Sequence, residues 1–125
     1  MTAFRAIVLE HFRHPHNRGP LAEATVSVEG ANPLCGDRIR VELRVHDRTI
    51  DDARFTADAC AICIASASVL TDHVRGMCLD DAERVEARWI HATLEGEPPP
   101  GRARCVSLPL DTLRRAIHEA RVTPA

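Results

Sequence analysis

Alternating apolar and polar positions are clearest over residues 38–45, where every second residue is aliphatic and the residues between them are charged. This period of two is typical of a strand with one buried and one solvated face. Shorter alternating patterns flank it, one before and one after a turn near Asp47. The apolar positions of the three segments are Ala24, Val26 and Val28; Ile39, Val41, Leu43 and Val45; and Ala53, Phe55 and Ala57. Three successive strands with short links predict an antiparallel meander.

Helical spacing appears on both sides of these strands. Residues 3–12 place four apolar side chains on one face, with Thr2 available as a cap and Pro15 as a stop. The stretch "CAICIASASVLTDHVRG" predicts a deeply packed helix over about 61–75 that ends at Gly76. Its first half is apolar nearly all round.

The remaining chain predicts three further helices. Asp80 and Glu83 form a predicted capping pair for a short helix, and a second helix is expected over 86–95. The stretch "GEPPPGR" ends it. Ser107 and Pro109 suit the first turn of a final helix that reaches about Arg121. The predicted class is α+β, a small three-stranded antiparallel sheet packed against a run of helices, with a helix at the N-terminus.

Length, charge and composition narrow the possible functions. The 125 residues suffice for one domain, over 1–125, with a modest core. A net charge of −2 makes no electrostatic case for binding nucleic acid or a membrane surface. No apolar run is long enough to span a membrane, and the N-terminal stretch has no signal-peptide cleavage site. We therefore expect a cytoplasmic protein.

The cysteines are the residues most suited to chemistry. There are five, at positions 35, 60, 63, 78 and 105. An odd number without a secretion signal argues against a disulfide framework, so each cysteine is either a small buried residue or part of a metal or thiol site.

Three cysteines fall at predicted ends of elements, where separate segments can converge. Cys35 lies in the loop before the long strand, Cys60 at the junction of the third strand and the buried helix, and Cys105 just ahead of the final helix. A helix N-terminus stabilises the thiolate of the last two. Asp37 adds an oxygen ligand, and Gly36 frees the loop to aim both groups. Together, Cys35, Asp37, Cys60 and Cys105 suit a tetrahedral zinc or iron site.

Four motifs then resemble one family. These are "EHFRHPHNRG", "NPLCGD", "DARFTADACAICIASASVLTDHVRG" and "RCVSL", which are similar in order and spacing to the IscU/SufU iron–sulfur cluster scaffolds, also found as the N-terminal part of NifU. The resemblance covers about residues 5–120.

The resemblance implies a function and a site. A cysteine desulfurase would deliver persulfide sulfur, a transient 2Fe–2S cluster would assemble, and recipient apo iron–sulfur proteins would receive it. Cys35, Asp37, Cys60 and Cys105 would hold the cluster or zinc, and Cys35 or Cys105 would accept the persulfide. The aspartate is linked in the family to release of the cluster. Such a protein is a scaffold rather than an enzyme, although a sulfurtransferase activity stays open.

Several positions depart from the family pattern. Arg104 replaces the histidine that precedes the last cysteine in IscU-type members, as a basic residue does in SufU-type members. Three roles stay open for Arg104. It favours the Cys105 thiolate, or it favours a desulfurase contact, or it is a solvated surface residue. Only 44 residues separate Cys60 from Cys105, which fits the shorter IscU type. "PPPGR" replaces the stretch that a dedicated chaperone reads, which puts that interaction in doubt.

The other cysteines and the histidines have simpler interpretations. Cys63 is either an alternative ligand or persulfide acceptor, or a buried small residue; Cys78 is expected to be incidental. His11, His14 and His16 are expected at the surface or against the desulfurase rather than on a metal, and His73, His91 and His118 in solvent.

Three alternative functions compete with a scaffold. A zinc-dependent sulfurtransferase that relays persulfide is favoured by Arg104, and a structural zinc module is disfavoured because a domain of this size folds without metal. A zinc deaminase lacks the upstream His/Cys-x-Glu motif.

Overall fold

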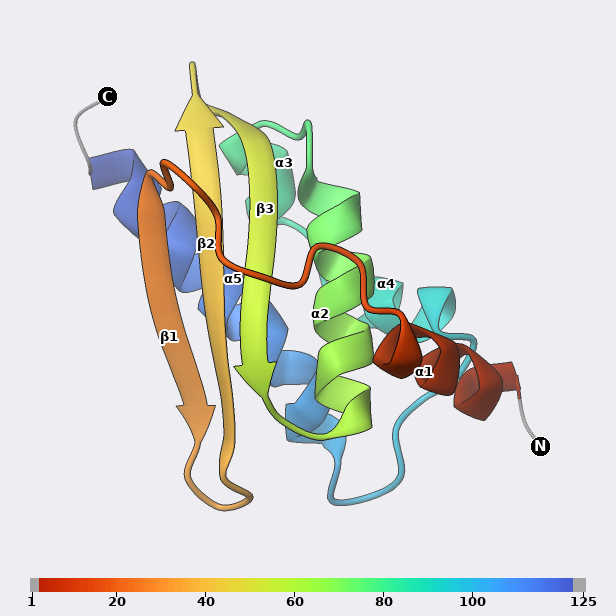
Figure 1. Ribbon diagram of the computed structural model, residues 1–125. Helices are drawn as coiled ribbons and strands as arrows, with labels where there is room; N and C mark the ends of the chain where they lie inside the picture. The colour runs from red at the N-terminus through yellow and green to blue at the C-terminus, as the bar shows by residue number, and fades with distance from the viewer. Residues whose placement is uncertain (1–2, 123–125) are drawn as a thin grey trace.

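The computed structural model describes residues 3–122, which form a three-stranded sheet and five helices (Figure 1). The predicted α+β class is confirmed. The elements in chain order are α1 (Ala3–Arg13), β1 (Val26–Asn32), β2 (Asp37–His46), β3 (Thr49–Asp58), α2 (Ala61–Val74), α3 (Leu79–Glu83), α4 (Ala87–Thr93) and α5 (Ala103–Val122).

The sheet is an antiparallel meander in the order β1-β2-β3, as the alternation predicts. In β1 every second residue is buried, and β2 follows the same pattern through Leu43. Asp47 and Arg48 link β2 to β3 with φ angles of 51° and 62°, the left-handed pair of a tight two-residue hairpin. Ala24 lies ahead of β1 instead of within it.

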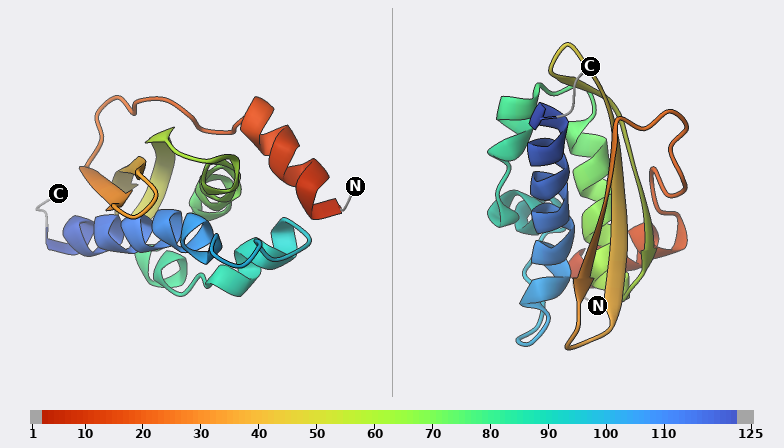
Figure 2. Two further views of the ribbon diagram at one scale, coloured as in Figure 1. Left: turned by 90° about the horizontal axis from the view of Figure 1, so that it is seen from below. Right: turned by 90° about the vertical axis from the view of Figure 1, so that its left-hand side faces the viewer.

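Helices α2 and α5 enclose the core. α5 packs against β1 and β2, while α2 packs beside β3 and α5 and is covered in turn by α1 (Figure 2). The buried face of the sheet is mainly aliphatic, with Phe55 of β3 fully buried and the polar residues Asn32 and Asp37 buried at one end. Burial of these side chains supplies the driving force that holds the layers together.

One glycine sets the distance between α5 and the sheet. A Cβ built on Gly30 of β1 would lie 2.1 Å from Oγ1 of Thr112 on α5, so only glycine lets the helix approach this closely. The approach matters for the site because α5 carries Cys105.

The short helix α3 corrects two predictions. Asp80 and Glu83 do not cap it; both pair with Arg121 of α5, at 2.6 and 2.8 Å. The cap is Cys78, whose sulfur accepts the N–H of Asp81 at 3.4 Å. Cys78 is therefore a capping residue instead of an incidental one. It directly precedes the helix, where a side chain can accept a free N–H of the first turn, whereas Asp80 already lies within the helix.

Other boundaries agree with the sequence to within a few residues. α1 ends at Arg13, ahead of Pro15, while the expected cap Thr2 lies outside the described residues. α2 ends at Val74, and Gly76 follows with φ +87°. Within residues 3–122, no helix has the length and apolar character needed to cross a membrane.

Candidate functional site

The loop "NPLCGD" forms the turn between β1 and β2. The Asn32 carbonyl accepts the N–H groups of Cys35 and Gly36 at 3.3 and 2.9 Å, and its side-chain oxygen accepts the N–H of Leu34 at 3.1 Å. Gly36 has φ +78°, a conformation that favours glycine. The turn leaves Cys35 exposed and places Asp37, 7% exposed, as the first residue of β2.

The antiparallel pairing of β2 with β3 brings Cys60 to the same edge. Arg38 pairs with Asp58, so the end of β3 lies beside the start of β2. The chain then turns, and Cys60 becomes the N-cap of α2 with extended backbone and no side-chain cap bond. Its N–H donates instead to Oδ1 of Asp37 at 3.1 Å, so one carboxylate links β2 to the N-terminus of α2.

Cys105 lies within α5, not ahead of it, which corrects the predicted boundary. The helix begins at Ala103, because the N–H of Arg102 bonds the Pro99 carbonyl at 3.0 Å and the N–H of Cys105 bonds the Arg102 carbonyl at 3.0 Å. Pro109 lies inside the helix instead of in its first turn. A proline there removes the hydrogen bond that a backbone N–H would make to the Cys105 carbonyl.

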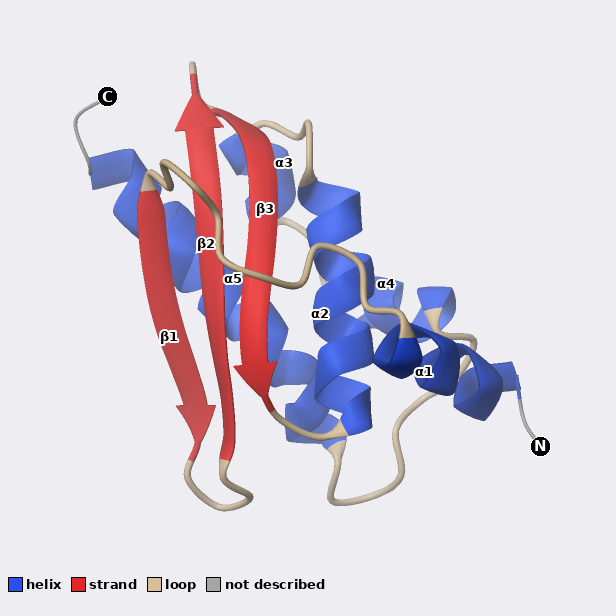
Figure 3. Cartoon of the chain, viewed as in Figure 1, coloured by secondary structure: helices blue, strands red, loops and turns tan. Residues whose placement is uncertain are grey.

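These three segments meet at one end of the molecule (Figure 3). The sulfurs of Cys60 and Cys105 lie 3.2 Å apart, and the Cys105 sulfur lies 3.6 Å from Oδ2 of Asp37. One ligand atom from each residue lies within 4.8 Å of the others. Two thiols and a carboxylate at this spacing fit a zinc or iron ion.

Cys35 lies outside this set of three, on the rim of the same cavity. The cavity measures about 600 Å³ and its lining also includes Leu34, Arg102 and Arg104. Of the four residues that the sequence indicated as ligands, the fold gathers three and leaves Cys35 in solvent beside them.

Burial changes the chemistry expected of two thiols. Cys105 is 3% exposed, and burial together with the neighbouring Cys60 raises the pKa of Cys105 to about 12. This is opposite to the easily formed thiolate expected at a helix N-terminus, because burial disfavours the charged form of the thiol. Cys63 is fully buried beneath the site, and burial raises its pKa as well. A buried neutral thiol fits the structural interpretation of Cys63, not the interpretation as a ligand.

Arg102 is a residue of the cavity lining that the sequence patterns do not single out. Arg102 lines the cavity with Cys105 and Cys60, and interaction first with Cys105 and then with Cys60 raises the pKa of the Arg102 guanidinium. Arg104, for which the sequence leaves open a role at the Cys105 thiolate, a desulfurase contact or a solvated position, is exposed on the cavity lining. The sequence signal that could have indicated Arg102 is its place at the end of "PPPGR", directly before α5. Its carbonyl accepts the N–H of Cys105.

The histidine-rich segment before β1 fastens to α2. Oγ of Ser68 hydrogen-bonds Nδ1 of His11 and accepts the N–H of His16, each at 2.8 Å. Nδ1 of His16 pairs with Asp72 at 2.5 Å. Burial, and then the nearby His16, lower the pKa of His11. These histidines hold α1 and the following loop against α2.

Among the other histidines, one expectation fails. His118 is exposed and His91 is half-buried. His73 is not in free solvent: its ring stacks on Trp89, with centroids 3.8 Å apart, because α2 and α4 pack together there.

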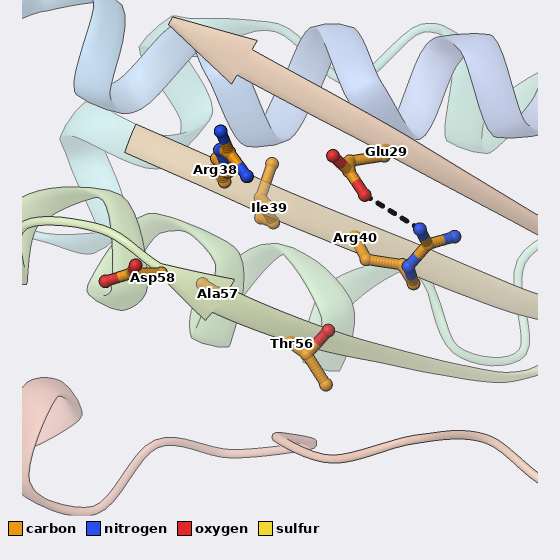
Figure 4. A pocket seen from close by; sticks show the side chains of 7 residues that line it. All are labelled: Glu29, Arg38, Ile39, Arg40, Thr56, Ala57 and Asp58. Carbon is orange, nitrogen blue, oxygen red and sulfur yellow. Dashed lines mark hydrogen bonds and ion pairs between the residues drawn. The ribbon is translucent and has the colours of Figure 1, made fainter. Parts of the chain in front are cut away.

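A second hollow lies on the outer face of the sheet (Figure 4). Its lining carries charges of both signs from all three strands, including an ion pair between Arg40 and Glu29 at 2.8 Å. Such a surface is typical of a solvated sheet face rather than of a thiol or metal site.

Comparison with known proteins agrees with this geometry. The family described as "NifU-like N terminal domain" matches residues 3–123. The "Iron-sulfur cluster assembly scaffold protein IscU" of Escherichia coli K12 is 33% identical over 119 residues, covering 92% of this chain and 91% of that protein. The "Zinc-dependent sulfurtransferase SufU" of Bacillus subtilis is 36% identical over 81 residues, covering 65% of this chain and 54% of that protein.

A solved structure has the same fold. The N-terminal part of a NifU-like protein from Brucella abortus superposes with a TM-score of 0.76 at 23% identity, covering 94% of both chains. The chain spans about half the length, 54%, of the first two curated relatives that it matches. The chain belongs to the NifU-like N-terminal domain family, which includes the IscU and SufU proteins.

Proposed function

We propose that this member of the NifU-like family is an iron–sulfur cluster assembly scaffold with one functional domain over 1–125. It receives sulfur from a cysteine desulfurase, assembles a transient 2Fe–2S cluster and transfers it to recipient apo iron–sulfur proteins. The observation that carries the proposal is the convergence of Asp37, Cys60 and Cys105, from three separate segments, within 4.8 Å. A ligand set built from distant segments on an open cavity suits cargo that has to enter and leave.

We propose Cys35 as the fourth ligand. It lines the same cavity, and the turn that carries it contains Gly36 in a left-handed conformation. Cys35 and Cys105 are the proposed persulfide acceptors. Their exposure differs, since Cys35 is exposed and Cys105 is 3% exposed, so Cys35 is the thiol that a protein donor reaches first.

The donor set also accommodates a resident zinc ion. Thiolate and carboxylate ligands bind zinc tetrahedrally, and a bound zinc would hold the sulfurs deprotonated at neutral pH. Asp37 would be the hard oxygen ligand among softer sulfurs, and a weakly matched ligand suits release.

The second candidate function is a zinc-dependent sulfurtransferase that relays persulfide sulfur. It is favoured by the SufU relative and by the basic residue Arg104, which stands immediately before Cys105 on the cavity lining. Under this candidate, metal would stay bound and sulfur alone would pass through the site. The protein would then be counted as an enzyme, whereas a scaffold is a carrier.

The proposed partners are proteins, a cysteine desulfurase and cluster recipients, in the cytoplasm. Recognition by the chaperone that reads IscU-type proteins is not part of the proposal, because "PPPGR" lacks the leucine, valine and lysine of the recognised stretch and forms the turn before α5.

Anaerobic reconstitution tests the proposal. Purified protein is incubated with ferrous iron, cysteine and a catalytic amount of desulfurase, and visible absorption and metal content are measured. A scaffold gives the charge-transfer bands of a 2Fe–2S cluster, and the bands disappear in Cys35→Ala, Cys60→Ala and Cys105→Ala. Cys78→Ser is the matched control and keeps them, because Cys78 caps α3 away from the cavity. Tightly held zinc, no cluster and accelerated desulfurase turnover would instead establish the sulfurtransferase.

A further inference from the structure

The two thiols of the site are closer to each other than two separate ligands need to be. The sulfurs of Cys60 and Cys105 are 3.2 Å apart, whereas a disulfide bond measures about 2 Å. A movement of roughly 1 Å would therefore join them. Both belong to the N-terminal ends of helices, Cys60 as the cap of α2 and Cys105 in the first turn of α5.

The surroundings let these side chains make that movement. Cys60 makes no side-chain capping bond, and its carboxylate partner Asp37 holds its backbone N–H, not its sulfur. The Cys60 thiol is half-buried on the cavity wall, so a small rotation has room. Arg102 lines the same cavity as Cys60 and Cys105, and its guanidinium provides positive charge on that lining.

We propose that Cys60 and Cys105 form a dithiol pair that converts a bound persulfide sulfur into sulfide. The inference rests on the proposed function, because the persulfide has to arrive from a desulfurase, directly or through Cys35. The inference goes beyond the proposed function because it names the protein's own thiols as the source of the two electrons that reduce the sulfur.

The step balances in atoms and electrons. The Cys60 thiolate attacks the inner sulfur of a persulfide on Cys105, and a new bond forms between the two cysteine sulfurs. The bond from the Cys105 sulfur to the outer sulfur breaks, and the outer sulfur leaves as hydrosulfide with the electron pair. The persulfide sulfur is reduced to sulfide while the thiol pair is oxidised to a disulfide, and an external thiol reductant has to restore the pair. A persulfide on Cys60 attacked by Cys105 would give the same products.

The geometry favours this pair over the other cysteines. The 3.2 Å approach is to the Sγ of Cys105, which is the inner sulfur of a persulfide carried there. Cys63 is fully buried and does not line the cavity, and Cys35 lies outside the 4.8 Å set. The hydrosulfide would be released into the cavity that Asp37 and Cys35 border, where the charge of Arg102 stabilises an anion.

The test mixes metal-free, reduced full chain with an equimolar amount of desulfurase that has been charged with cysteine and then desalted, so that no free thiol is present. Intact mass after alkylation measures persulfide, a sulfide assay measures release, and peptide mapping locates disulfides. We expect about one sulfide per chain and a Cys60–Cys105 disulfide in the wild type. Cys60→Ser retains the persulfide and releases sulfide at least about tenfold more slowly. The matched control Cys63→Ala, a cysteine one turn further along the same helix, behaves as the wild type.

Two outcomes would overturn the inference while leaving the proposed function intact: persulfide that accumulates on the wild type without the disulfide, or equal sulfide release from Cys60→Ser. Absence of both persulfide and disulfide on the wild type after mixing with the charged desulfurase would overturn sulfur acceptance and the inference together.

A second arm requires neither persulfide nor a variant. Diamide, a two-electron thiol oxidant, is added to the metal-free wild type. We expect the Cys60–Cys105 disulfide as the main product, and any other dominant pairing contradicts the inference. This arm remains decisive if Cys60→Ser does not fold.

Discussion

Asp37 has two separable functions in this structure, and two substitutions distinguish them. Oδ1 accepts the N–H of Cys60 at the N-terminus of α2, and Oδ2 lies beside the Cys105 sulfur. Asp37→Asn keeps an oxygen that can accept the N–H but loses the charged ligand. Asp37→Ala loses both.

The expected cost follows from these contacts. Asp37 acts as a remote cap of α2, whose own N-cap makes no side-chain bond, and losing a cap costs about 1 kcal/mol. The negative charge near a helix N-terminus adds about 0.3–1 kcal/mol, offset in part by relief from burying a carboxylate that is 7% exposed. We expect Asp37→Ala to lower the free energy of unfolding by about 1–2 kcal/mol, a Tm decrease of roughly 3–10 °C, and Asp37→Asn by less than about 1 kcal/mol.

The assay is urea unfolding of the metal-free chains with chelator present, followed by a zinc competition titration. Both variants should bind zinc at least about tenfold more weakly, because each loses the carboxylate ligand. Equal stability of Asp37→Ala and the wild type would refute the capping contribution. Equal zinc affinity of Asp37→Asn and the wild type would refute the ligand contribution.

Three further predictions test other parts of the fold. Gly30→Ala should lower the free energy of unfolding in urea by about 1–3 kcal/mol, because its Cβ would meet the Thr112 hydroxyl. Adding Thr112→Ala should recover the lost stability. An unchanged stability of the single variant would contradict the close packing. Burial lowers the pKa of His11, so its neutral form stabilises the fold, and this contribution is fully present above pH 6.5 and is lost as pH falls through the folded pKa. The Tm decrease between pH 7.5 and 5.5 should therefore be smaller in His11→Asn than in the wild type or in the exposed control His118→Asn. Equal decreases in all three proteins would contradict a contribution of neutral His11 to stability. Cys63→Ala should keep full zinc content and lower stability by about 1 kcal/mol, and loss of zinc, measured by metal analysis, would restore Cys63 as a ligand.

The strands and the buried helix were predictable because a single physical pattern specifies each. In β2 the aliphatic residues face α5 and the charged residues face water, so the alternation is visible along the chain. α2 is surrounded by β3, α1 and α5, so its apolar character extends round the helix. Three of the four proposed ligands could likewise be placed near one another from the sequence, because Asp37, Cys60 and Cys105 all lie close to predicted ends of strands or helices.

The boundaries of α5 and α3 could not be predicted in this way. Local rules place Pro109 in a first turn, but packing of Val106 and Leu110 in the core keeps the preceding turn helical. The sequence also offered Asp80 and Glu83 as a cap, yet both carboxylates are drawn to Arg121, which lies far along the chain and reaches α3 only after folding.

The sequence by itself determined the fold class, the family and the residue types of the site, since these depend on periodicity and on short motifs. Only the tertiary structure decided how the site is arranged. The register of β2 against β3 sets Asp37 beside Cys60, and the close approach of α5 permitted by Gly30 brings Cys105 within 3.2 Å of Cys60 while Cys35 stays in solvent. Distances between residues remote in sequence depend on strand register and helix packing, and no local pattern contains them.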